Sequence, residues 1–243
     1  MKNTRFICLT AVLAVAAGGA TTAGAQTGPW SVSFDLGAQM PVNGDVHTGG
    51  SGSVLGLPTQ VTSKSYGDIY GRGLYWTAGL GYGVSERGEI RVEGGYTKNP
   101  AQRLQVGTVA ELPLFAQFDD YRTFGMDFGY RQYLSAATTR PYIGASVGFV
   151  RLDTVASEFS VPAAGVVLSG VDFLDSSVVP AFGFGGGVQV QLSERVALQT
   201  GVDFKWHGDA TGADGLAGTG LETINDQTRR WSVPITAGVT IGF

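Results

Sequence analysis

Residues 231–243 read Trp231-Ser-Val-Pro-Ile-Thr-Ala-Gly-Val-Thr-Ile-Gly-Phe243. Every second side chain, counted from Trp231, is apolar, and the side chains between them are small or polar. Because side chains of a β-strand point alternately to its two faces, this stretch predicts a strand with one apolar and one small polar face. Residues 30–40 follow the same rule, with an apolar face made of Trp30, Val32, Phe34, Leu36, Ala38 and Met40.

Six further segments repeat this two-residue period and predict strands at residues 72–84, 89–98, 121–134, 141–151, 179–192 and 196–207. Short turns at residues 85–88, 135–140 and 193–195 alternate with four connections of roughly twenty to thirty residues each. Short turns on one rim and long loops on the other are typical of outer-membrane barrels, whose short turns and termini are periplasmic. We therefore predict an all-β, eight-stranded antiparallel up-and-down transmembrane β-barrel with four long extracellular loops.

Alternation alone does not say which face points outward, because a soluble barrel turns its apolar face inward. An eight-stranded barrel has an interior only wide enough for side chains to fill it. The apolar face carries the four Trp and most of the Phe, Val, Ile and Leu, which would overfill that space. The apolar face is therefore expected to meet lipid, with an aromatic girdle supplied by Trp30, Trp76, Trp206 and Trp231.

The N-terminus has the three parts of a secretory signal peptide. Lys2 and Arg5 precede an apolar run from Phe6 to Ala17, and a small-residue pattern follows at 23–25. A transmembrane anchor would need about 20 apolar residues, which this run does not reach. We predict a cleavable signal peptide over residues 1–25 and an outer-membrane β-barrel domain over residues 26–243. Cleavage would also remove Cys8, the only cysteine.

The charge and the metal-binding residue types exclude several classes of function. The signal segment carries two of the 16 basic residues and none of the 20 acidic ones, so its removal changes the net charge from −4 to −6. Nucleic-acid binding needs a basic face, so no nucleic-acid partner is expected. The two histidines, His47 and His207, are far apart in the sequence and give no metal-ligand spacing. Four glycines within residues 183–187 lie in mid-strand without a following helix, so we expect no nucleotide site and no cofactor.

Seven charged residues fall on the small polar face and are expected in the lumen: Asp35, Arg91, Glu93, Asp127, Arg131, Asp203 and Lys205. Carboxylates and cations alternate on neighbouring strands, and an unpaired charge in a narrow lumen is costly, so we expect a paired, hydrogen-bonded network. Such a network is either a polar plug or a gate on a narrow ion path. The plug is favoured, because barrels with an aqueous channel typically have about 16 strands or more.

The long loops are the expected working surface, because a rigid scaffold usually carries its recognition residues on loops. Residues 152–179 contain Asp153, Glu158, Asp172 and Asp175, no Lys or Arg, and several apolar side chains. This composition predicts a hairpin that extends beyond the membrane. Two interpretations stay open: an adhesive or divalent-ion-bridged contact with lipopolysaccharide, and a solvated, variable loop, which is favoured.

Phe243, at the end of an alternating strand, resembles the C-terminal signal that hands outer-membrane barrels to the barrel-assembly machinery. With the stretches Phe128-Gly-Tyr-Arg-Gln-Tyr-Leu134 and Arg140-Pro-Tyr-Ile-Gly-Ala-Ser-Val-Gly-Phe149, residues 26–243 resemble the small outer-membrane β-barrels that include the OmpA transmembrane domain, OmpX-type proteins and opacity surface antigens. The resemblance implies the outer membrane of a Gram-negative bacterium. It also implies contacts with outer-membrane lipid, lipopolysaccharide and the assembly machinery, and an extracellular ligand bound through the long loops.

These observations favour a non-enzymatic protein with a structural or adhesion-like surface role. The first alternative is a narrow porin, and the second is a lipid A-modifying enzyme. His207 is followed by Gly208 and Asp209, whereas the lipid A deacylases carry a serine two residues after their catalytic histidine. Because the nucleophile is missing from that position, we assign no catalytic residue.

Overall fold

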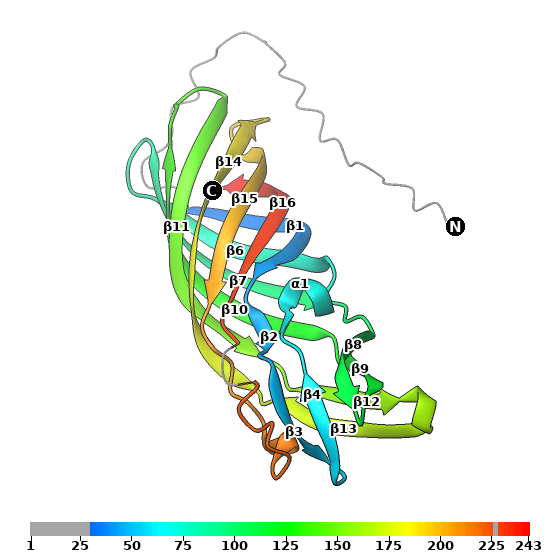
Figure 1. Cartoon of the computed structure of the whole chain (residues 1–243). Helices are drawn as coiled ribbons and strands as arrows, with labels where there is room; N and C mark the ends of the chain where they lie inside the picture. The colour runs from blue at the N-terminus through cyan, green and yellow to red at the C-terminus, as the bar shows by residue number, and fades with distance from the viewer. Residues whose placement is uncertain (1–29, 226–227) are drawn as a thin grey trace, which may run out of the picture.

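The computed structural model describes residues 30–225 and 228–243; the expected signal segment and its cleavage site lie outside these ranges. Eight long strands form a closed antiparallel barrel (Figure 1), which confirms the predicted fold. They are β1 (Trp30–Asn43), β6 (Gly73–Gly83), β7 (Gly88–Asn99), β10 (Tyr121–Tyr133), β11 (Thr139–Leu152), β14 (Ser177–Gln191), β15 (Val196–His207) and β16 (Arg230–Gly242). The barrel closes where β1 pairs with β16, so that neighbours follow the order β1-β16-β15-β14-β11-β10-β7-β6.

Glycines on the inner face of the barrel leave room for a large side chain in the lumen. The Tyr142 side chain of β11 points inward and is buried. A methyl group added at Gly187 or Gly201 would lie 2.6 Å from the Tyr142 hydroxyl oxygen. Glycine is therefore required at both positions to make room for this ring, as the interior volume of a narrow barrel demands.

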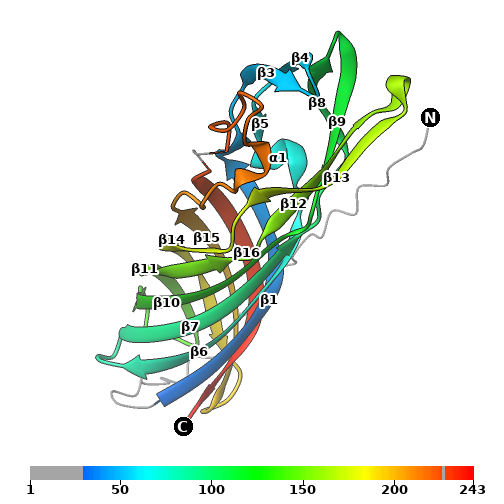
Figure 2. The ribbon, with the colours of Figure 1, turned by 90° about the horizontal axis from the view of Figure 1, so that it is seen from below.

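The third long connection forms the predicted hairpin, because its two halves pair with each other, but it is part of an ordered sheet, so the favoured interpretation of residues 152–179 as a solvated loop is wrong. Beyond one end of the barrel the long connections form a six-stranded sheet (Figure 2), in the order β13-β12-β9-β8-β4-β3. Its strands are β3 (Gly50–Val54), β4 (Leu57–Val61), β8 (Leu104–Val109), β9 (Leu112–Phe118), β12 (Val155–Val161) and β13 (Val166–Leu174). Shorter elements are β2 (Asp45–His47), β5 (Lys64–Ser65), the helix α1 (Tyr66–Ile69) and the 3-10 turns η1 (Pro162–Ala164) and η2 (Asp214–Leu216). No helix within the described ranges is long and apolar enough to cross a membrane.

We call this region the cap: residues 44–72, 100–120, 153–176 and 208–225. Its fourth connection, residues 208–225, contacts both edges of the sheet. Leu174 next to one edge forms a β-bridge with Gly212, and at the other edge the Ser53 amide donates to the Thr219 carbonyl oxygen at 2.7 Å. These contacts occupy part of each sheet edge, which otherwise presents unpaired backbone groups.

The cap has a hydrophobic core of its own. Val46, Ile69, Val106 and Phe173 come from three different connections, and their side chains are fully buried. This core gives the physical reason for the correction: each connection alone has too few apolar residues to fold, but together they bury a shared interior. The acidic residues of 152–179 stay at its surface, where Asp153, Glu158, Asp172 and Asp175 are all exposed.

A histidine lies inside this core. The His47 side chain is 1% exposed and packs between Phe118 and Phe173, with ring centroids 6.3 and 6.1 Å away. Its Nδ1 lies 3.1 Å from the Thr48 carbonyl oxygen, and because a carbonyl only accepts, Nδ1 carries the proton. Burial lowers the pKa of His47, while Thr48 and Asp45 favour the charged form and Lys64 opposes it.

We expect the cap to lose stability as the pH falls below about 6.5, the ordinary histidine pKa. The folded cap holds His47 neutral, whereas the unfolded chain binds a proton there, so stability declines by at most about 1.4 kcal/mol per pH unit. Hydrogen exchange of cap amides in the full-length protein, measured at pH 8 and pH 5.5, checks this. His47→Phe should reduce the pH dependence of cap stability. Equal protection factors of the wild-type cap at both pH values would contradict the prediction.

Candidate functional site

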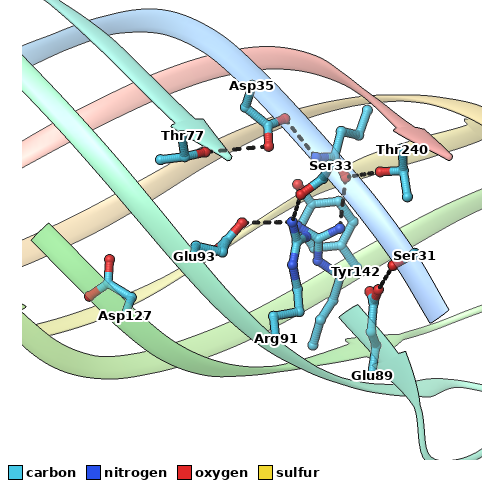
Figure 3. Close-up of polar contacts among 12 residues, drawn as sticks. Ser31, Ser33, Asp35, Thr77, Glu89, Arg91, Glu93, Asp127, Tyr142 and Thr240 are labelled. Carbon is cyan, nitrogen blue, oxygen red and sulfur yellow. Dashed lines mark hydrogen bonds and ion pairs between the residues drawn. The ribbon is translucent and has the colours of Figure 1, made fainter. Parts of the chain in front are cut away.

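The barrel lumen collects the charged residues that the sequence assigned to it. Arg91 and Glu93 lie two residues apart on β7, so they share a face, and their side chains form an ion pair at 2.6 Å. The Arg91 guanidinium also donates to the Ser33 hydroxyl of β1 at 2.7 Å. Figure 3 shows this cluster inside the translucent barrel wall. Arg91 is buried at 5% exposure, so both contacts are shielded from bulk water.

A second ion pair crosses the lumen. Lys205 of β15 contacts the carboxylate of Asp127 on β10, and its ammonium lies 5.7 Å from the centroid of the Tyr75 ring. β11 and β14 separate these two strands in the barrel order. The pair therefore joins strands that are not neighbours, because an eight-stranded ring is narrow enough for a lysine to reach across the lumen.

A neutral amide connects two further predicted charges. Gln199 of β15 donates to the Asp35 carboxylate at 2.6 Å, and its amide oxygen accepts from Arg131 at 2.8 Å. The Arg131 guanidinium also stacks on the Tyr142 ring, 3.9 Å from its centroid. Alternation placed Gln199 on the inner face, but charge was the only criterion for the predicted network, so Gln199 was missed.

Glu89 is a carboxylate that sequence reasoning also missed. It is 8% exposed and accepts hydrogen bonds from the Ser31 hydroxyl at 2.8 Å and the Tyr133 hydroxyl at 2.9 Å. Its position has the same parity as Arg91 and Glu93, so the strand period was a sufficient signal. The predicted start of that strand at residue 89 left Glu89 at its edge.

The seventh predicted residue, Asp203, lines a polar cavity of about 70 Å³ in the middle of the lumen. Asp35, Arg91, Glu93 and Lys205 line the same space. The network of ion pairs and hydrogen bonds on either side of it spans from β1 to β10. This arrangement fixes the wall strands against each other. Asp203 is the one predicted lumen charge that makes no hydrogen bond or ion pair within residues 30–225 and 228–243.

His207 lies at the rim between barrel and cap, where it is 4% exposed. Its Nδ1 accepts a hydrogen bond from Arg230 Nε at 3.2 Å, and the Arg230 guanidinium stacks 3.8 Å from the centroid of the Tyr121 ring. A histidine that is covered and engaged by a cation is poorly placed as a general base. Within residues 30–225 and 228–243, no group of three or more His, Cys, Asp or Glu side chains could hold a metal ion.

The outer face of the barrel is apolar and exposed. Phe34, Leu80, Phe128, Val147 and Ile235 are each at least 44% exposed, on different strands. A closed barrel with bulky apolar side chains around its outside has the surface that a bilayer solvates and water does not. The chain is an outer-membrane β-barrel.

The predicted girdle residues of this barrel lie on its outer face. Trp206 and Trp231 are register partners near the cap, and Trp76 lies near the same rim. Trp30 begins β1 at the opposite rim, where its ring is 5.0 Å from that of Tyr82. Phe243 is 71% exposed, and its amide donates to the Trp30 carbonyl oxygen at 2.9 Å. The girdle and the assembly signal stay predictions.

No family model and no curated protein matches the chain. Among solved structures, Neisserial surface protein A is similar at a TM-score of 0.46 and 15% identity, over 93% of this chain and 100% of that one. Ail, the attachment invasion locus protein of Yersinia pestis, gives 0.44 and 11%, over 90% and 100%. The outer membrane protease OmpT from Escherichia coli gives 0.47 and 9%, over 93% and 99%.

The outward orientation predicts the effect of a charge on the barrel wall. Phe128 lies in the middle of β10 and is 50% exposed. Phe128→Arg should lower the free energy of unfolding by about 2–4 kcal/mol in lipid vesicles, because an arginine near the bilayer midplane is poorly solvated. Urea titration followed by tryptophan fluorescence measures this. Phe128→Leu is the matched control, and equal losses in the two variants would contradict a lipid-facing position.

The ion pair across the lumen predicts a second, non-additive effect. Lys205→Met leaves the Asp127 carboxylate buried without its cation and should destabilise the barrel by about 3–5 kcal/mol. Adding Asp127→Asn to that variant should recover most of the loss in the same urea titration.

The lumen network as a whole also predicts whether the barrel conducts ions. A polar plug predicts no steady open state of the wild type in planar bilayers. A steady single-channel conductance that disappears in Arg91→Gln or Arg131→Gln would instead identify the network as the lining of an ion path.

Proposed function

We propose that this outer-membrane barrel is a non-enzymatic surface-interaction protein with an adhesion-like role, and that it recognises its target with the distal turns of the cap. Three hairpins, β3–β4, β8–β9 and β12–β13, lie side by side in one sheet and all leave from the barrel rim (Figure 2). Their turns lie along the outer edge of the cap, on the side away from the barrel (Figure 2). We call residues 54–58, 109–113 and 161–168 the distal turns.

The distal turns expose apolar side chains to solvent. Leu55 is 77% exposed, Val167 60%, and Leu57 46%. Glu111 is the only charged residue among the distal turns. Apolar residues gathered at an exposed end, away from both the bilayer and the cap core, are characteristic of an interaction surface.

The backbone of two of these turns carries strain, and this is the observation on which the proposal rests. Leu55 and Gly56 have φ values of 53° and 78°, and Ala110 and Glu111 have 46° and 68°. Two-residue turns with positive φ at both positions favour Asn-Gly, because other L residues are crowded there. Leu55, Ala110 and Glu111 are the described non-glycine residues with positive φ, and all three lie at the distal turns.

Backbone strain of this kind costs about 1–3 kcal/mol per residue. Neither turn recovers this cost by packing, since Leu55, Ala110 and Glu111 are all exposed. A side chain that neither packs nor suits its backbone is explained if another molecule contacts it. Leu55, at the tip of its hairpin, is the residue best placed to insert into an apolar surface.

The lumen and the rim support this proposal over the two alternatives. The hydrogen-bond network from Asp35 through Gln199 to Arg131 crosses the lumen and disfavours a narrow porin. The burial of His207 and its contact with Arg230 disfavour a lipid A-modifying enzyme.

Relieving the strain should stabilise the cap and weaken recognition. In a variant with Leu55→Asn, Ala110→Asn and Glu111→Gly, both turns carry Asn-Gly, so the cap should gain about 1 kcal/mol or more. Cells displaying this variant should be retained several-fold less on octyl-coated beads than cells displaying the wild type. Proteolysis of the hairpins in intact cells reports cap stability in parallel.

Ser51→Asn, on the exposed side of β3, is the control and should change neither measurement. The triple variant should show lower retention and higher protease resistance than the wild type. Misfolding cannot explain this combination, because a misfolded cap would be cleaved more easily. Unchanged retention of the triple variant on octyl beads would contradict recognition through the distal turns.

A further inference from the structure

The cap contains a cavity that its own side chains leave unfilled. It lies between the six-stranded sheet and residues 215–224 of the fourth connection, and its volume is about 70 Å³. The lining is mostly aliphatic and aromatic: Val106, Leu114, Phe118, Phe173 and Leu216 contribute to it, together with His47 and two threonines. Protein interiors are packed with few voids larger than a water molecule, so a space of this size in a small core is unusual.

The lining contains no charged residue, and its hydroxyl groups already have partners. Thr59 donates to the Leu57 carbonyl oxygen, and Thr219 donates to the Leu216 carbonyl oxygen. His47 is different, because its Nδ1 is bound to Thr48 and its Nε2 makes no hydrogen bond within the described ranges. A neutral imidazole with a protonated Nδ1 presents Nε2 as an acceptor.

We propose that this cavity is a binding site for a small uncharged aromatic molecule that carries one hydroxyl group, as phenols do. The apolar lining accepts the ring, and His47 Nε2 accepts the hydroxyl proton. Apolar cavities in proteins stay dry and take up small apolar molecules, and a single polar group fixes the orientation of such a ligand. The lowered pKa of His47 keeps its imidazole neutral, so it acts as an acceptor rather than a cation.

The geometry rejects other ligands. A carboxylate or ammonium group would be buried without an opposite charge, which is strongly unfavourable. A water molecule needs two to four polar partners, and the cavity offers one free acceptor. A protein segment or a whole lipid headgroup is too large for a volume of about 70 Å³. Val54, Val109 and Leu168 belong both to the lining and to the distal turns, but the strained residues Leu55, Ala110 and Glu111 do not line the cavity.

Methyl NMR of the full-length protein in lipid nanodiscs tests the proposal. The probes are 4-fluorophenol, fluorobenzene and the charged 4-fluorobenzoate. The methyl signals of Val106, Leu114 and Leu216 should shift saturably with 4-fluorophenol. The lipid-facing Leu74 and Leu198 provide the internal control, because they report only probe dissolved in the bilayer.

Two variants locate the ligand. Leu216→Trp fills the cavity and should abolish the saturable shifts. His47→Phe removes the acceptor and should weaken 4-fluorophenol about fivefold, the worth of one neutral hydrogen bond, while leaving fluorobenzene unchanged. Val106→Ala enlarges the cavity and should raise the affinity of 4-propylphenol, which keeps the test valid if the tryptophan variant does not fold.

The results separate this site from the proposed surface role. Shifts confined to Leu74 and Leu198, or saturable shifts that persist in Leu216→Trp, would overturn the site. Equal weakening of both neutral probes by His47→Phe, or tight binding of 4-fluorobenzoate, would overturn the phenol assignment. The Asn-Gly variant of the distal turns should bind 4-fluorophenol like the wild type.

Discussion

The small interior of an eight-stranded ring is the constraint on which the rest of this structure depends. The ring can hold glycines, hydroxyls, a few aromatic rings such as Tyr142 and a limited number of charges. Gly187 and Gly201 are required beside that tyrosine because a single added methyl group would collide with it. Bulky apolar side chains are excluded from the inside, so they lie outside, and the surface they form is stable only in a bilayer.

The same constraint determines how the interior charges are satisfied. In a wide pore each charge would be hydrated, but here the opposite wall is within reach of a lysine side chain, and Lys205 contacts Asp127 across the lumen. Asp35 and Arg131 are connected through Gln199, which donates to one and accepts from the other. Removing water from a charge is tolerable only when such partners replace it. The wall strands are thereby connected by side-chain contacts across the lumen as well as by backbone hydrogen bonds between neighbours.

The barrel was predictable from sequence because its strands are long and each has two contrasting faces, so the two-residue period persists over ten or more residues. The predicted strand at 196–207 coincides with β15, and β1 differs only by continuing to Asn43. The cap was not predictable in this way. Its strands, such as Leu104–Val109, are short. Each pairs with its hairpin partner in the same connection, but the pairs that join the hairpins into one sheet, β4 with β8 and β9 with β12, link different connections, and no local pattern indicates them. Gln199 was missed for a related reason: a neutral amide acquires its role only when two distant strands meet.

The rigid barrel explains how the cap can carry both strain and empty space. The ends of each connection are fixed by a closed ring, which removes much of the chain entropy that a free domain of this size would have to lose on folding. The cap core can therefore tolerate an unfilled volume beside His47 and strained turns at Leu55 and Ala110. Both features are destabilising where they occur, and both lie on the side away from the membrane. A fold that needed only to span the bilayer could close this rim with short polar turns, as the opposite rim does. The ordered cap is therefore explained by a requirement other than barrel stability.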